Sequence, residues 1–321
     1  MTIRRIRQLV CPPSRAGAAT SIHATSSARV CQLGRAVKGL EWEGNYLSRV
    51  RHARRRRIKL KGSKNQSGSV MARLQGKVAF VTGAGQGVGQ GIAYALAAEG
   101  AAVAVTGRTL EKVEKTAAEI VRRGGKALAL ACNVKDAESM RIAVEKTVQA
   151  FGGLQILVNN AQEVPLGSLN DVTDADFAAG WESGPLATFR LMKLCYPHLK
   201  GDGNIINLGS PASKRWDMSG YGAYAAVKEA IRSISRAAAG EWGKDGIRTN
   251  IILPLANSPA MEWWTRERPE ESAAFVSTVP TKRVGDCEQD IGRFVASLCT
   301  EDSRYVNGQS IALDGGQAFL G

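Results

Sequence analysis

The chain has 321 residues, 44% of them hydrophobic and 22% charged, which is ordinary for a folded protein of one large or two small domains. Its formal net charge of +14 arises in residues 1–70, which hold 16 Lys and Arg but only Glu41 and Glu43 as acids, whereas the rest of the chain holds 27 residues of each sign. A basic surface for nucleic acid can therefore be argued only for the first 70 residues, and no apolar run is long enough to span a membrane.

Residues 1–70 show neither helix nor strand periodicity, are rich in Arg, Ser and Gly, and contain four consecutive arginines at 54–57. We expect a disordered basic extension there, followed by one folded domain over residues 71–321. Three other interpretations stay open: an organelle transit peptide, a nucleic-acid-binding arm, or a start site placed upstream of a natural beginning at Met71. We favour an extension without a role of its own, so nucleic acid is not an expected partner.

From Lys77 onward, short apolar runs alternate with amphipathic segments. Helices are predicted near 88–99, 110–123, 136–151, 174–199, 219–241 and 286–299. Strands are predicted at 77–82, 101–106, 127–131, 154–159, 204–208, 249–253 and 310–313. The strand runs are almost continuously apolar, as is typical of strands buried on both faces of a parallel sheet. This order predicts an α/β fold: a single doubly wound, seven-stranded parallel sheet of the Rossmann type, with helices on both faces.

Five glycines in the stretch VTGAGQGVGQG, Val81–Gly91, follow the first predicted strand and open the first predicted helix. Because glycine is costly to order, this concentration indicates a sharp turn and a close approach of the backbone to a ligand. The free N–H groups and positive end of the helix suit a phosphate. The spacing fits Thr-Gly-x-x-x-Gly-x-Gly at Thr82, Gly83, Gly87 and Gly89, which predicts a dinucleotide site. A glycine-rich turn without a ligand is the alternative.

Three further motifs follow later strands: Asn159–Ala161, Ser210 and the Tyr224-x-x-x-Lys228 pair. Tyr224 and Lys228 are four residues apart on a predicted helix, so they share one face. A nearby ammonium favours the phenolate and lowers a phenol pKa from its usual value of about 10. The pair therefore predicts a proton-transfer site, whereas Tyr221, which has no lysine four positions on, is expected to pack.

In this order the motifs resemble the short-chain dehydrogenase/reductase family, over residues 71–321 and with most likeness to its 3-oxoacyl-carrier-protein-reductase-like branch. The resemblance implies Tyr224 as general acid/base, Lys228 as ribose ligand and pKa tuner, and Ser210 as a hydrogen-bonding partner of the substrate oxygen. It implies hydride transfer between a nicotinamide and a carbonyl or alcohol of ketone or oxoacyl type, in a homodimer or homotetramer. The implied cofactor-binding residues are Thr82, Gly83, Gln86, Gly87, Val88, Gly89, Arg108, Asn133, Val134, Asn160, Ala161, Tyr224, Lys228 and Pro254.

The end of the second predicted strand bears on the choice of cofactor. The segment Thr106–Thr109 offers no acid to hold the ribose 2′-OH of NAD, but Arg108 can pair with a 2′-phosphate. We therefore expect NADP(H), with NAD(H) as the alternative. Arg108 as a solvated loop residue is the competing interpretation.

Four positions depart from the family pattern. Gln162 replaces a usual Gly, Asn133 a usual Asp at the adenine, and Leu255 a usual Gly. Gly184 stands where the family has an Asn that holds a water in a proton relay to the lysine. These departures motivate a second hypothesis: a dinucleotide-binding sensor or scaffold with little turnover.

The substrate side is expected in the segment 255–282, after the sixth predicted strand. Its Met261, Trp263, Trp264 and Phe275 would form an apolar wall facing Trp216, with core packing as the alternative for each. Cysteines are scattered, so we expect no metal site, and reduced thiols in a cytoplasmic protein, with organelle targeting left open.

Overall fold

Seven parallel strands form one sheet in the order β3-β2-β1-β4-β5-β6-β7. The computed structural model describes residues 72–215 and 220–318, so the predictions for residues 1–70, for Met71 and for Trp216 lie outside the described residues. The strands are β1 (Val78–Thr82), β2 (Ala102–Gly107), β3 (Lys126–Ala131), β4 (Ile156–Asn159), β5 (Gly203–Leu208), β6 (Ile247–Pro254) and β7 (Ser310–Leu313). The predicted fold class is confirmed.

Strands β1, β4 and β5 are buried along their whole length, as their continuous apolar runs predicted. The register aligns the carboxyl ends of neighbouring strands: Thr82 of β1 pairs with Thr106 of β2, and Asn159 of β4 pairs with Asn207 of β5. The order of the strands reverses between β1 and β4. Because ligands of open α/β sheets bind beyond the carboxyl ends of the strands at such a reversal, this edge is where a site is expected.

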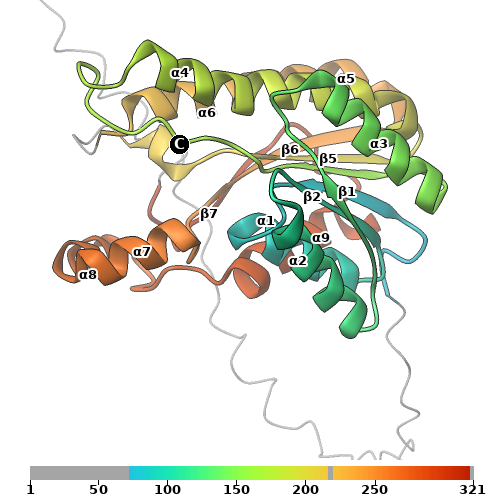
Figure 1. The fold of residues 1–321 in the computed structure, drawn as a ribbon, viewed down its shortest axis with the longest axis horizontal. Coiled ribbons are helices and arrows are strands. Elements are labelled where there is room, and N and C mark those ends of the chain that lie inside the picture. Colours follow the sequence, from blue (N-terminus) through green and yellow to red (C-terminus); the bar gives the residue numbers. More distant parts are fainter. Residues whose placement is uncertain (1–71, 216–219, 319–321) are drawn as a thin grey trace, which may run out of the picture. The chain divides into compact units, whose positions relative to one another are not determined.

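Helices cover both faces of the sheet (Figure 1). On one face lie α1 (Gly87–Ala98), α2 (Leu110–Arg122) and α9 (Arg293–Leu298), and on the other lie α3 (Ala137–Phe151), α5 (Ala187–Leu199) and α6 (Gly222–Trp242). Each layer has its own apolar core, with Ile92 and Ile120 in the first and Leu191 and Met192 in the second. Short 3₁₀ turns occupy Pro211–Lys214, Gly243–Asp245 and Glu301–Ser303.

The segment predicted as one helix over 174–199 is divided in three. It comprises α4 (Asp174–Trp181), a π-helical turn η1 (Glu182–Leu186) and α5. Pro185 lies inside the π turn, and its missing N–H and bulky ring are incompatible with a regular α-helix interior. A second π turn, η4 (Cys287–Gly292), precedes α9, where one helix had been predicted over 286–299.

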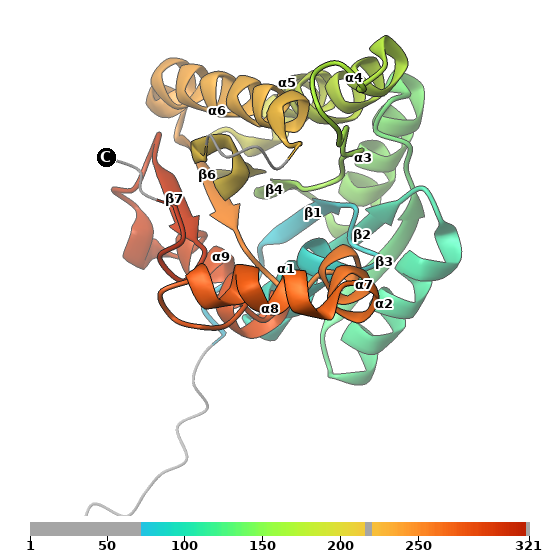
Figure 2. The ribbon, with the colours of Figure 1, turned by 90° about the vertical axis from the view of Figure 1, so that its left-hand side faces the viewer.

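Two helices that the sequence analysis did not predict lie within the segment 255–282: α7 (Pro259–Glu267) and α8 (Pro269–Thr278). Each begins with proline at its first turn, and the Ser258 side chain accepts a hydrogen bond from Met261 N, which caps α7. The two helices project from the body of the fold in Figure 1 and lie side by side in Figure 2.

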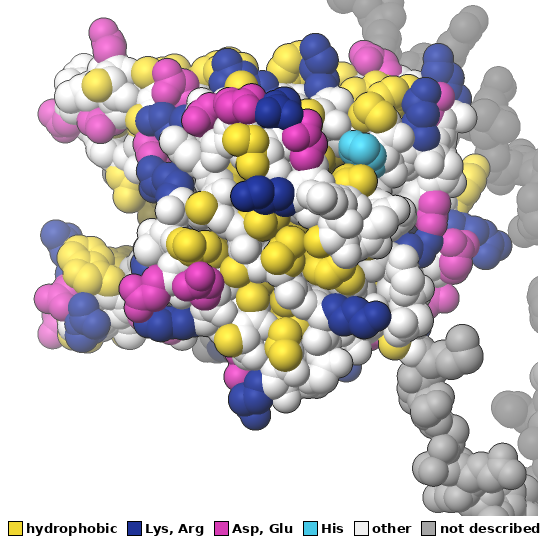
Figure 3. Space-filling model, turned by 45° about the vertical axis from the view of Figure 1, so that its right-hand side comes forward, with side chains coloured by type: hydrophobic (Ala, Val, Ile, Leu, Met, Phe, Trp, Pro, Cys, Tyr) yellow, Lys and Arg dark blue, Asp and Glu magenta, His cyan; other side chains and the backbone are white. Residues whose placement is uncertain are grey.

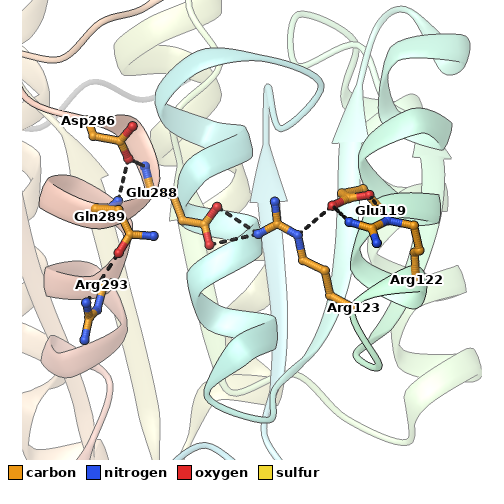
Figure 4. Close-up of polar contacts among 7 residues, drawn as sticks. All are labelled: Glu119, Arg122, Arg123, Asp286, Glu288, Gln289 and Arg293. Atoms are coloured by element: carbon orange, nitrogen blue, oxygen red, sulfur yellow. Dashed lines mark hydrogen bonds and ion pairs between the residues drawn. The ribbon is translucent and has the colours of Figure 1, made fainter.

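The π turn η4 packs directly on α1. A Cβ at Gly91 would collide with the backbone of Cys287, and one at Gly292 would collide with the backbone of Gly91. On the surface, Arg123 at the end of α2 reaches Glu288 of η4 at 2.8 Å and Glu119 at 2.7 Å (Figure 4). The helices α1 and α2 and the turn η4 are therefore held together by backbone contact and by an ion-pair network.

One face of the molecule, drawn in Figure 3, carries Lys and Arg side chains interspersed with Asp and Glu, with apolar side chains between them. This agrees with the equal numbers of basic and acidic residues after residue 70. The electrostatic potential of that face is therefore not of one sign, so the face does not attract a polyanion such as nucleic acid. Within the described residues, no helix combines the length and the hydropathy needed to cross a membrane.

Candidate active site

A cavity of about 1200 Å³ opens at the carboxyl ends of the strands, between the glycine turn, the end of β5, helix α6 and the pair α7–α8. Single-ligand sites are typically about 300–1000 Å³, so this cavity has room for a dinucleotide and a second molecule. Most of the predicted site residues line it together: Gly83, Gln86, Gly87, Val88, Arg108, Asn133, Val134, Asn160, Ala161, Ser210, Tyr224, Lys228 and Pro254.

The glycine turn has the conformation that its sequence predicted. Gly83 and Gly87 have φ angles of 63° and 58°, in the left-handed region that favours glycine. Helix α1 begins at Gly87 with no side-chain cap from Gln86, whose amide oxygen instead accepts from Lys112 Nζ at 2.7 Å. The first turn of α1 carries no acid. The backbone N–H groups of that turn lie at the positive end of the helix and beside the cavity, so they fit a pyrophosphate.

Two residues predicted to bind cofactor, Thr82 and Gly89, do not line the cavity. The Thr82 hydroxyl accepts from the backbone N–H groups of Asn160 at 2.9 Å and Ala161 at 3.0 Å. The Asn160 amide in turn donates to the carbonyl oxygens of Thr82 and Gly83. A Cβ at Gly89 would collide with that amide. These three residues, Thr82, Gly89 and Asn160, therefore join the glycine turn to the end of β4. Thr82 and Gly89 support the cavity wall without lining the cavity.

Ser210, Tyr224 and Lys228 meet in this cavity. Ser210 follows β5, its hydroxyl accepts from Ala212 N at 3.2 Å, and it is near enough to Tyr224 to favour a lower pKa of the phenol. Lys228 is only 4% exposed, and its Nζ donates to the Leu208 carbonyl at 2.7 Å and lies 5.4 Å from the centre of the Tyr224 ring. The 3₁₀ turn after Ser210 and the first turns of α6 bring the three side chains together, although residues 216–219 between them lie outside the described residues.

The protonation equilibria differ from the expectation that Lys228 lowers the pKa of the phenol. Burial raises the pKa of Tyr224 to about 12, which outweighs the lowering by the nearby Ser210. Burial also lowers the pKa of Lys228 to about 7, because a desolvated ammonium is disfavoured. In the protein without ligand, Tyr224 therefore carries its proton at neutral pH and is prepared to donate it, while Lys228 titrates near neutrality.

Five charged side chains lie around the part of the cavity beyond β2 and β4. Arg108 lies 2.6 Å from Glu163, and Lys135 lies 3.5 Å from Glu163 and 3.6 Å from Glu182. Lys135, Glu163 and Lys112 line the cavity and were not predicted from the sequence. They had no motif to mark them: Lys112 lies on the helix α2, and Lys135 and Glu163 are lone charges in loops, where such side chains are usually solvated. Arg108, Lys112 and Lys135 give this part of the cavity three cations for an anionic group, beside the acids Glu163 and Glu182.

The Asn133 side chain, predicted to face the adenine, is held by its own loop. Its Oδ1 accepts from Lys135 N at 3.2 Å, and its backbone N–H donates to Ser139 Oγ at 3.0 Å. The Nδ2 group is thus the part of the amide that can meet a ligand, as a hydrogen-bond donor.

The outer wall of the cavity is aromatic. The rings of Trp264 and Phe275, from α7 and α8, pack edge to face with centroids 5.3 Å apart, and Trp263 is 54% exposed beside them. Arg215 lies 5.5 Å from the centre of the Phe275 ring. Tyr221, expected only to pack, also lines the cavity and contacts Tyr224 edge-on. This wall suits a bulky apolar molecule.

The departures at positions 162 and 184 lie in direct contact. Gly184 is buried in the π turn, and the point where its Cβ would stand is 3.0 Å from both Cδ and Nε2 of Gln162. Gln162 lines the cavity.

Among the described residues, no group of three or more His, Cys, Asp or Glu is arranged to hold a metal ion.

Comparisons with known proteins agree with this geometry. Residues 83–318 match the family model described as Enoyl-(Acyl carrier protein) reductase. The chain is 40% identical over 255 residues to 12alpha-hydroxysteroid dehydrogenase of Clostridium sp., which covers 77% of this chain and 98% of the relative. It is 32% identical over 255 residues to hydroxynaphthalene reductase-like protein Arp2 of Metarhizium guizhouense, covering 76% and 95%.

Among solved structures, the crystal structure of a short chain dehydrogenase from Burkholderia cenocepacia J2315 in complex with NADP matches with a TM-score of 0.71 and 34% sequence identity, over 76% of this chain and 99% of that chain. The chain belongs to the short-chain dehydrogenase/reductase family. It is an oxidoreductase that acts on a CH–OH/C=O couple with a nicotinamide dinucleotide.

Proposed function

We propose that this oxidoreductase is NADP(H)-dependent and interconverts a ketone and a secondary alcohol on a bulky fused-ring substrate, with Tyr224 as general acid/base. The observation that carries the proposal is the meeting of Ser210, Tyr224 and Lys228 in the cavity that begins at the glycine turn. A pure sensor or scaffold has no need of a phenol, a hydroxyl and a buried amine at one point of a ligand cavity.

Each of the three side chains has a role in the reduction. The Ser210 hydroxyl holds the substrate carbonyl oxygen, and Tyr224, protonated at neutral pH, donates its proton to that oxygen as charge develops there. Lys228, fixed by the Leu208 carbonyl, keeps its amine beside the phenol. The bound nicotinamide supplies the hydride in reduction or accepts it in oxidation.

The preference for NADP(H) is supported by the charges beyond β2. Arg108 and Lys135 offer cations where a ribose 2′-phosphate would approach, and no acid at the end of β2 is available for a 2′-OH. The related structure from Burkholderia cenocepacia that was solved in complex with NADP adds support. NAD(H) remains the alternative cofactor.

The fused-ring substrate is supported by two relatives, whose names refer to a hydroxysteroid and a hydroxynaphthalene, and by the aromatic wall of Trp264 and Phe275. An oxoacyl substrate is the alternative within the same reaction class.

We further propose that residues 71–321 form the catalytic domain, that 255–282 is its substrate segment, and that the protein is a cytoplasmic homodimer or homotetramer. The exposed aromatic side chains of Phe177, Trp181 and Phe189 support self-association.

The test is turnover of NADPH by the full chain with a panel of steroid ketones, fused-ring aromatic ketones and 3-oxoacyl thioesters. We expect turnover of at least one fused-ring ketone, and Tyr224→Phe should lower kcat by at least about 10²-fold while the Kd for NADPH is retained. NADPH binding without turnover of any member by the wild type would favour the sensor. Turnover confined to the thioesters would refute the fused-ring substrate alone.

A further inference from the structure

The Gln162 side chain has both of its polar atoms, Oε1 and Nε2, buried without a hydrogen-bond partner among the described residues. Buried amides in native proteins are nearly always paired, because an unpaired one carries the full cost of its removal from water. An apolar side chain of the same length would avoid that cost. The partner of this amide is therefore a water molecule or a ligand in the cavity that Gln162 lines.

The amide is held in place by the π turn. Glu163 N donates to Ser183 Oγ at 2.9 Å, and Ser183 Oγ donates to Ala179 O at 2.7 Å, so the loop after β4 is attached to the turn beside Gln162. The Gln162 amide then fills the space left by the missing side chain of Gly184. A Cβ at Gly184 would lie 3.0 Å from the amide and 2.9 Å from Cγ1 of Val227 on α6.

The space at Gly184 is thus bordered by the Gln162 amide on one side and by Val227 on the other, and Val227 directly precedes Lys228 on α6. An ammonium has three N–H donors, and for Lys228 one of them reaches the Leu208 carbonyl. The titratable side chain in contact with Lys228 is Tyr224, from the same helix, and β5 contributes the uncharged carbonyl of Leu208. Gln162 and Lys228 line the same cavity, where the amine has donors to spare and the amide has an acceptor oxygen to spare.

We propose that Gln162 is a positioning residue for Lys228: its amide oxygen holds a water molecule that accepts a hydrogen bond from the Lys228 amine. This water stabilises the charged form of Lys228 beside Tyr224. The inference rests on the proposed function where it assigns Lys228 to the proton chemistry of Tyr224. It goes beyond that function by giving a task to a side chain at a position where the family has none.

The first readout needs neither cofactor nor turnover. In protein labelled with ¹³C-lysine, NMR titration gives the pKa of Lys228, with Lys228→Met to assign the resonance. Gln162→Met removes the water's anchor and should lower that pKa by about one unit, whereas Gln162→Glu keeps an acceptor, adds a negative charge and should raise it. An unchanged Lys228 pKa in both variants would overturn the proposal.

The second readout is the pH profile of kcat. With Gln162→Met, we expect kcat to fall about tenfold at pH 8 and the alkaline limb to move to lower pH by the interval seen in the titration. Gln162→Glu should restore part of the loss. A loss of NADPH affinity with an unchanged profile would mean that the amide binds the cofactor directly, and would also overturn the proposal.

Two variants separate this role from folding. Gln162→Met replaces the amide by an apolar side chain of the same length, so its Tm should stay close to that of the wild type, and Gln162→Gly combined with Gly184→Asn returns an amide to the same space from the facing side and should restore the Lys228 pKa. Gln155→Met, which breaks a hydrogen bond to Val78 N before β4, is the control that costs stability without moving the profile. If the wild type proves inactive, the proposed function fails and the titration still decides the role of Gln162.

Discussion

An ion pair joins Arg108 to Glu163 at 2.6 Å, across the carboxyl end of the strand β1 that lies between their own strands, β2 and β4. The glycine turn begins at that end of β1. In the protein without cofactor, the arginine that is proposed to hold a 2′-phosphate is therefore engaged by an internal carboxylate. On the proposed function, the cofactor phosphate and Glu163 would compete for Arg108, and this competition can be measured.

Glu163→Gln should lower the Kd for NADPH about two- to fivefold and change the Kd for NADH less. The reason is that an exposed ion pair contributes about 0.2–1 kcal/mol, and only the phosphate of NADPH gains from the released guanidinium. Fluorescence titration with both cofactors measures the difference. Glu182→Gln, which removes a charge near Lys135 but leaves Arg108 paired, is the control. An equal gain for both cofactors would indicate a general loss of repulsion and no specific competition.

Arg108→Ala should raise the Kd for NADPH about 10- to 100-fold and leave the Kd for NADH within about twofold, because a charge-assisted hydrogen bond contributes about 1.5–3 kcal/mol. Isothermal titration calorimetry with the two cofactors measures both values. Arg141→Ala, on the exposed face of α3 where Glu138 and Glu145 hold the side chain, is the matched control. Equal weakening of NADPH and NADH would contradict the proposed preference for NADP(H).

Lys228 should make stability depend on pH. Its pKa falls from 10.5 in the unfolded chain to about 7 in the folded protein, so between these values the unfolded state binds more protons and the free energy of unfolding rises with pH. Below about pH 7 both states carry the proton, and the cost of burying the charge is fully present. The contribution to the slope reaches at most about 1.4 kcal/mol per pH unit.

Urea unfolding of wild type and Lys228→Met between pH 7 and 9 measures this slope, which should be absent in the variant. Burial raises the pKa values of the Cys132 and Cys287 thiols to about 11, so near and above pH 9 these groups act in the opposite direction, but they cancel in the difference between the two proteins. Lys146→Met on the exposed face of α3 should keep the wild-type slope. The same slope in all three proteins would contradict a buried, titrating Lys228.

Trp264→Ala should lower kcat/KM for a fused-ring ketone about 10- to 100-fold, because its half-buried ring packs on Phe275 and forms the apolar wall. Turnover of a small open-chain ketone and the Kd for NADPH should change little. Steady-state kinetics with the two ketones measure the effect. Equal losses for both substrates would mean that the wall supports the structure of the site and does not select the substrate.

The sheet could be predicted closely because it is built from local patterns. The run Ser310–Leu313 was predicted with its exact ends, and the other six strands to within two residues at each end, since continuous apolar runs mark strands that are buried on both faces. The π turn at Gly184 and Pro185 could not be predicted, because a wider turn leaves the 3.6-residue periodicity on either side almost unchanged. The start of α7, by contrast, had readable signals in Ser258 and Pro259.

The site was predictable where chemistry follows a motif. Tyr224, Lys228 and Ser210, whose catalytic roles stay a prediction, could be placed at one cavity because each has a fixed place beside a predicted element. The cofactor contact expected for Thr82 stays a prediction; its hydroxyl accepts from the backbone N–H groups of Asn160 and Ala161, which follow a strand distant in sequence and which no local pattern could indicate. The protonation of Tyr224 was misjudged for a related reason: burial depends on the whole fold, whereas a lysine four residues away is visible in the sequence.

The segment that carries α7 and α8 is closed at its base, because Ala256 pairs with Gly285 in a parallel bridge and Asn257 N donates to Gly285 O at 2.8 Å. One end continues from β6, and the other continues into η4, whose backbone rests on Gly91 of α1. Both anchors thus belong to the framework around the glycine turn. Exchanging residues 257–284 for those of a relative should therefore transfer the relative's preference for an alcohol or ketone substrate. The affinity for the dinucleotide should stay unchanged.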